Sequence, residues 1–161
     1  MNQSDTGFKH NWNFQEQYID QVCNIIKANA MNIVDVSIST PEDDMKRATD
    51  LKVTISSGDV AVRIRRSKYN YRDITIRAYK NGYKTELHKL REGYGDFYLY
   101  AWENKEQTGI DEYVLFDINK ARALFEENKT ITMNRDGNSG FVTYTIDAIN
   151  QQGAIIDHKK Y

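Results

Sequence analysis

The feature that most constrains the fold is the segment 97–102, in which both sets of alternating side chains are apolar. Along this stretch Phe97, Leu99 and Ala101 alternate with Tyr98, Tyr100 and Trp102. Successive side chains of a strand point to opposite faces, so a strand of this kind lies inside a sheet that is covered on both sides. We therefore predict an α/β (α+β) fold, with a mixed central β-sheet flanked by helices. The 161 residues are enough for one domain with its own core.

The flanking helices and further strands follow from the spacing of apolar residues. Phe14 to Ala30 has helical spacing and predicts an amphipathic first helix, and Asn32 to Ser39 alternates as a strand. Thr85 and Asp117 are expected to cap two later helices, the second running from Ile118 to Glu127. Further strands are predicted at 112–116, 131–133, 141–146 and 154–157.

A predicted hairpin over residues 48–66 has charges on one face. Leu51 and Val53 share the apolar face of the first arm, and Val62 and Ile64 share that of the second. If residues 71–78 form a third strand of the same sheet, Ile74 and Ile76 extend the apolar face under a helix that carries Val22 and Ile26. The opposite face of this one sheet is then expected to carry Asp50, Arg63, Arg65 and Arg77.

Charge is unevenly distributed, although the formal net charge is only -1. The segment 63–91 has ten Lys and Arg against two acids, and an acidic stretch precedes it. A polarised surface can attract a polyanion without being basic overall. The predicted nucleic-acid-binding residues are Arg63, Arg65, Arg66, Lys68, Arg72 and Arg77. Tyr69 and Tyr71 lie between them and could stack on bases, but a solvated loop explains the same run.

The cysteine content and the hydropathy of the chain indicate in which cellular compartment the protein is expected. Cys23 is the single cysteine, so no disulfide or cysteine-rich zinc site is available within one chain. No apolar run approaches the roughly 20 residues that span a bilayer, and the first residues lack a signal-peptide core. We expect a cytoplasmic protein with no membrane partner.

Four segments resemble a phage-encoded branch of the PD-(D/E)XK nuclease-like superfamily, which includes restriction endonucleases and Holliday-junction resolvases. These segments are 48–51, 60–66, 71–77 and 85–87 with 93–96, and the resemblance covers most of residues 14–125. It implies a restriction-endonuclease-like core over 14–102 and a C-terminal β/α extension over 103–161. It also implies DNA as the partner and, for a phage protein, the host cytoplasm.

The resemblance also implies site residues. Glu16 matches the helical acid of the superfamily and Asp50 the strand acid, whereas Arg63 and Arg65 replace the acid and the lysine of its third element. Glu86, with Lys89 one turn on, could supply the missing acid, so that Asp50 and Glu86 bind Mg²⁺. A second register, with Glu42 after Pro41 and then Asp50-Leu51-Lys52, spells the family formula directly.

Two functions remain open from the sequence. One is a Mg²⁺-dependent DNA endonuclease that uses Asp50 and Glu86, with Glu16 and Lys89 in support. The other is a catalytically inactive nuclease fold without a metal, which binds DNA or a host protein. In that case Asp50 pairs with Arg63 or Arg65, and Glu86 stabilises the start of its helix.

Overall fold

A large mixed sheet forms the centre of the protein. The computed structural model describes residue 14 and residues 16–29, 33–38, 51–55, 58–69 and 71–161, with no side chains described for 33–38 and 51–55. The six strands, in spatial order, are β1 (Ile33–Ile38), β2 (Leu51–Ile55), β3 (Gly58–Arg65), β5 (Phe97–Glu103), β6 (Ile110–Asp117) and β9 (Ile155–Lys160). β3 and β5 run parallel, and the other neighbours are antiparallel. The predicted α+β class with a mixed sheet is confirmed.

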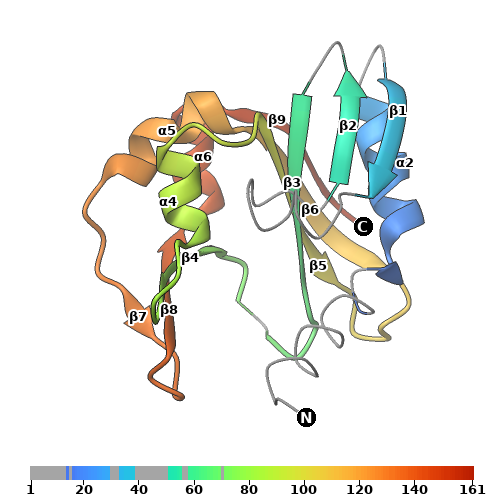
Figure 1. Cartoon of the computed structure of the whole chain (residues 1–161). Helices are drawn as coiled ribbons and strands as arrows, with labels where there is room; N and C mark the ends of the chain where they lie inside the picture. The colour runs from blue at the N-terminus through green and yellow to red at the C-terminus, as the bar shows by residue number, and fades with distance from the viewer. Residues whose placement is uncertain (1–13, 15, 30–32, 39–50, 56–57, 70) are drawn as a thin grey trace.

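A small antiparallel sheet and helices complete the fold. This sheet has the order β4 (Ile74–Lys80), β8 (Ser139–Tyr144), β7 (Thr132–Met133). The helices are α2 (Ile19–Asn29), α4 (Glu86–Arg91), α5 (Ile118–Glu126) and α6 (Ile146–Gln151). Figure 1 shows α2 on one side of the large sheet and α4, α5, α6 and the small sheet on the other. No helix in the described ranges has the length and apolarity needed to cross a membrane.

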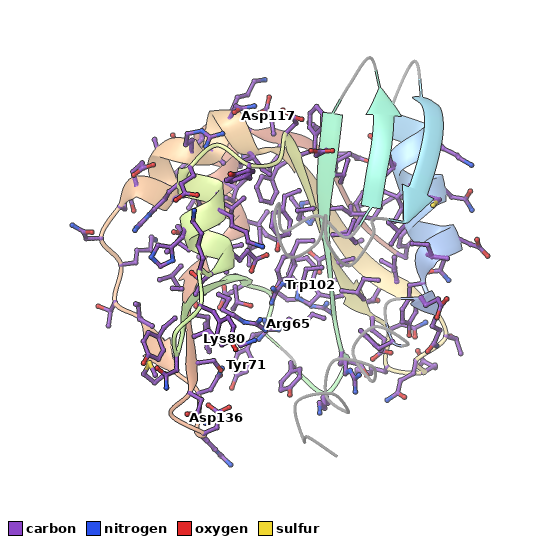
Figure 2. All side chains as sticks on the ribbon, in the orientation of Figure 1. Arg65, Tyr71, Lys80, Trp102, Asp117 and Asp136 are labelled. Carbon is purple, nitrogen blue, oxygen red and sulfur yellow. The ribbon has the colours of Figure 1, made fainter. Side chains whose placement is uncertain are left out.

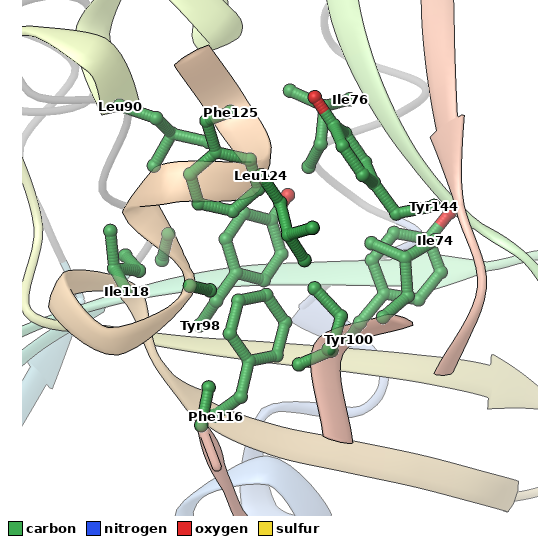
Figure 3. Packing of buried hydrophobic residues seen from close by; sticks show 14 of the residues in the cluster. Ile74, Ile76, Leu90, Tyr98, Tyr100, Phe116, Ile118, Leu124, Phe125 and Tyr144 are labelled. Carbon is green, nitrogen blue, oxygen red and sulfur yellow. The ribbon is translucent and has the colours of Figure 1, made fainter. Parts of the chain in front are cut away.

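β5 has apolar side chains on both faces, as its sequence predicts. Leu99 and Ala101 pack under α2 together with Val62 and Ile64 of β3. On the other face Tyr98, Tyr100 and Trp102 are almost completely buried, at 0–1% exposure. Figure 3 shows Tyr98 and Tyr100 packed among side chains of the helices and of the small sheet. The two faces of β5 thus belong to two separate hydrophobic cores.

The prediction of one sheet containing β3 and β4 is wrong. β4 pairs with β8 in the small sheet, and β5 takes the place beside β3. Parallel strands need a crossover, and here the chain forms β4 and α4 across one face before it returns as β5. Ile74 and Ile76 consequently pack against Tyr98 and Tyr100, rather than beneath α2 as predicted. The alternation of apolar residues assigns faces to a strand but does not identify its partner.

The assignment of side chains to the faces of β3 and β4 holds despite this change of sheet. Val62 and Ile64 pack under α2, so Arg63 and Arg65 project from the face that β4 covers. Thr75 and Arg77 lie on the side of β4 that meets these arginines. The crossover therefore places the charged side of β4 opposite the charged side of β3.

Candidate functional site

A cleft with a volume of about 540 Å³ opens where β3 ends. One wall is formed by β3 and the loop after it, from Arg63 to Tyr69, and another by Thr75 and Arg77 of β4. Residues of the β7–β8 hairpin, among them Phe141, also line it. We call this space the cationic cleft.

Five of the six predicted nucleic-acid-binding residues line the cationic cleft. These are Arg63, Arg65, Arg66, Lys68 and Arg77. None of the described residues that line the cleft is an Asp or a Glu. Cations gathered in a concave space favour an anion there, because the surrounding protein focuses the field. Glu86 offsets part of the charge of Arg63, and Glu103 part of that of Arg66.

Arg65 lies at the floor of the cleft. Its Nη1 donates to Tyr100 Oη at 3.0 Å and to Thr75 Oγ1, while its Nε has no exposed surface and no hydrogen-bond partner. Among the described residues no carboxylate pairs with this guanidinium. Figure 2 labels Arg65 next to Trp102, which is its partner in the register of β3 and β5. A half-buried guanidinium held by two hydroxyls keeps donors available for an anion.

The carboxylate of Glu86 accepts hydrogen bonds from three donors. Its Oε2 accepts from Arg63 Nη2 at 2.8 Å and from the Arg77 backbone N–H at 3.1 Å, and its Oε1 accepts from Tyr98 Oη. Burial and the Glu86 carboxylate beside it raise the pKa of Tyr98, so the phenol remains a donor. The Glu86 side chain is only 11% exposed. It joins β3, β4 and β5 at the start of α4.

Arg72, the sixth predicted residue, lies outside the cationic cleft. Its Nη2 pairs with Asp111 at 2.6 Å and its Nε lies 3.5 Å from Glu112. Glu112 is buried, and its Oε1 is also 2.9 Å from Nε2 of His158. We call Asp111 and Glu112, which both contact Arg72, the carboxylate cluster. Arg72 thus neutralises protein carboxylates, which distinguishes it from Arg65.

Of the predicted site acids, the structure describes Glu16 and Glu86. Glu16 is exposed and lies three residues before α2, whose apolar residues pack on the opposite face of the large sheet from those of α4. Asp50, Glu42 and Pro41 lie outside the described residues, and Lys89 is half-buried on α4. Over the described ranges no three His, Cys, Asp or Glu side chains form a group that could hold a metal ion.

Sequence reasoning missed the hydroxyls that hold Arg65. Tyr100 was interpreted only as a core residue, yet its Oη also lies 2.9 Å from Thr75 Oγ1. Thr75 is a buried polar residue between two isoleucines of β4, which is a signal for a specific partner. That partner depends on the pairing of β3 with β5 and on the position of β4, neither of which the sequence pattern contains.

Comparisons with known proteins identify no family. The sequence matches no protein-family model, and no curated protein matches it. Functional conclusions therefore depend on the geometry of the site.

Proposed function

We propose that this protein binds nucleic acid through the cationic cleft. The observation that carries the proposal is the convergence of cations from β3, from the loop after β3 and from β4 on one concave space. Arg65 supports it most directly, because its guanidinium faces hydroxyls and no described carboxylate. A phosphodiester supplies the negative oxygens that such guanidiniums bind.

Glu86 acts in this proposal as a positioning residue. Its carboxylate fixes Arg63 at the cleft and, through the Arg77 backbone N–H, fixes the strand that carries Arg77. With a guanidinium, an amide and a phenol already donating to both of its oxygens, Glu86 does not fit the role of a Mg²⁺ ligand in this arrangement.

The proposal is tested by measuring DNA binding against salt concentration. Fluorescence anisotropy of a labelled oligothymidylate should show an affinity that falls steeply with salt, because each neutralised phosphate releases condensed counterion. The double variant Lys68→Gln/Arg77→Gln removes two cations of the cleft and should reduce the slope by about one unit for each lost contact.

The control removes two cations from elsewhere. Lys120→Gln/Lys160→Gln changes the net charge equally at exposed positions on α5 and β9, and should leave the slope unchanged. An equal reduction of the salt-dependence slope in the two double variants would show that binding depends only on the net charge of the protein. Absence of binding by the wild type at low salt would refute the proposal.

The endonuclease function, which the sequence resemblance implies, makes a separate prediction. An endonuclease dependent on Mg²⁺ or Mn²⁺ should nick supercoiled plasmid and should lose this activity in Glu86→Gln. An intact plasmid with both metals would leave DNA binding as the function supported by the cleft.

A further inference from the structure

We infer that the cationic cleft takes single-stranded rather than double-stranded nucleic acid, with a base stacked on Tyr69. This inference rests on the proposed function and specifies its substrate class. It follows from the depth of Arg65, from the size of the cleft and from the aromatic side chain at its edge.

The depth of Arg65 favours a single strand. Its Nε is completely covered, and its hydroxyl partners belong to Thr75 and Tyr100, both of which are buried residues. The phosphates of a duplex lie on the outside of a broad cylinder, so they reach the exposed Lys68 and Arg77 more readily than the floor. One flexible strand can enter a cleft and bring a phosphate to the floor.

The size of the cleft also fits a single strand. A volume of about 540 Å³ lies in the range of pockets that enclose one small molecule, which corresponds to about one or two nucleotides. Such a space can hold a segment of one strand whose bases are unstacked. The bases of a duplex are sealed inside the stack unless they are flipped out.

Tyr69 supplies a ring for such a base. It is 47% exposed at the edge of the cleft, and two cations lie near its ring: Lys68 Nζ at 4.9 Å and Arg65 Cζ at 5.5 Å from the centroid. Proteins that bind single strands combine aromatic rings for bases with cations for phosphates. The sequence order Arg65, Arg66, Lys68, Tyr69 places both kinds of group at the end of β3 and in the loop after it.

The test compares three DNA ligands at one salt concentration. A labelled oligothymidylate should bind at least about tenfold more tightly than a duplex of equal length. Tyr69→Leu should weaken oligothymidylate binding about tenfold, whereas Tyr69→Phe, which retains the ring, should bind within about twofold of the wild type. An abasic strand of the same length retains the phosphates, so Tyr69→Leu should bind it as the wild type does.

Tyr83 provides a matched control. It is an exposed tyrosine with Lys80 Nζ 5.1 Å from its ring centroid, but it does not line the cleft. Tyr83→Leu should therefore leave all three affinities unchanged. Equal binding of single strand and duplex, or no effect of Tyr69→Leu on oligothymidylate, would overturn this inference while DNA binding itself stands. Failure of the wild type to bind any of the ligands would overturn the proposed function as well.

Discussion

Arg65 and Arg72 belong to the same basic segment but have opposite surroundings. Arg65 lies in the cationic cleft, where two hydroxyls hold it and no described carboxylate pairs with it. Arg72 lies against the carboxylate cluster, where Asp111 and the buried Glu112 compensate its charge. Each arginine contributes one positive charge to the segment, so composition alone does not distinguish them. Their different partners indicate that Arg65 is available to a ligand and that Arg72 serves the fold.

The same distinction applies to other cations of the basic segment. Arg91 donates to the backbone carbonyls of Phe125 and Glu127, and so joins α4 to the end of α5. Arg63 is held by Glu86 yet lines the cleft. The density of basic residues between 63 and 91 therefore overstates the charge that is presented to a ligand. The cleft, and not the whole segment, defines the candidate interface.

The largest expected effect concerns the stability of the cleft wall. Glu86→Ala leaves the phenol of Tyr98, the Arg77 N–H and the Arg63 guanidinium without their acceptor. Loss of a mostly buried charged acceptor should lower the free energy of unfolding by about 3 kcal/mol. Urea denaturation followed by circular dichroism measures this change.

Glu92→Ala is the matched control for Glu86→Ala. Glu92 stands at the other end of α4 and pairs with Lys84, with both side chains about half exposed. Exposed pairs contribute about 0–1 kcal/mol, so this variant should be nearly as stable as the wild type. Similar small losses in the two variants would contradict the joining role of Glu86.

The second expected effect concerns affinity and tests the comparison directly. Arg65→Gln should weaken oligothymidylate binding about tenfold, because a charge-assisted contact to phosphate is worth about 1.4 kcal/mol or more. Arg72→Gln should leave affinity unchanged and lower the stability instead, since it removes a partner of buried Glu112. The reverse pattern, with affinity lost at Arg72 and retained at Arg65, would break the distinction between the two regions.

The sequence predicted local features of the fold, such as helix starts and strand faces, because these depend on residues that are neighbours in the chain. Asp117 caps α5 as predicted, and its Oδ1 accepts from the backbone N–H groups of Asn119 and Lys120. Thr85 precedes α4 as predicted, although its hydroxyl contacts His88 Nδ1 rather than capping the backbone. The apolar faces of β5 are equally local, since alternation along one strand determines them.

The sequence did not predict which strands pair with each other. The partner of β4 depends on the crossover between β3 and β5, which alternation along each strand leaves undetermined. For the same reason the sequence offered Glu86 as a metal ligand or a helix-dipole residue, and did not indicate its contacts with Arg63 and Tyr98. The cations of the cleft were predicted as candidates, whereas the separation of Arg65 from Arg72 required their partners in space.

The smallest expected effect concerns the buried carboxylate of Glu103 and depends on pH. Burial pushes the pKa of Glu103 upward, but hydrogen bonds from the Ser67 N–H and the Tyr18 hydroxyl, together with the charge of Arg66, lower it overall. Glu103 therefore stabilises the fold fully above its unfolded pKa of about 4.3, and this contribution is lost as pH falls through the lower folded pKa. Glu103→Gln should reduce the free energy of unfolding at neutral pH by about 1 kcal/mol.

The pH dependence separates a lost carboxylate from a general packing defect at Glu103. In thermal unfolding from neutral to acidic pH, the difference in stability between wild type and Glu103→Gln should narrow as pH falls below the unfolded pKa of about 4.3 and through the lower folded pKa, because the wild-type carboxylate becomes protonated over that range. Glu106→Gln, at an exposed position in the following loop, removes one carboxylate too and should match the wild type throughout. A gap of constant size at every pH would show that the Glu103 carboxylate does not stabilise this region through its charge.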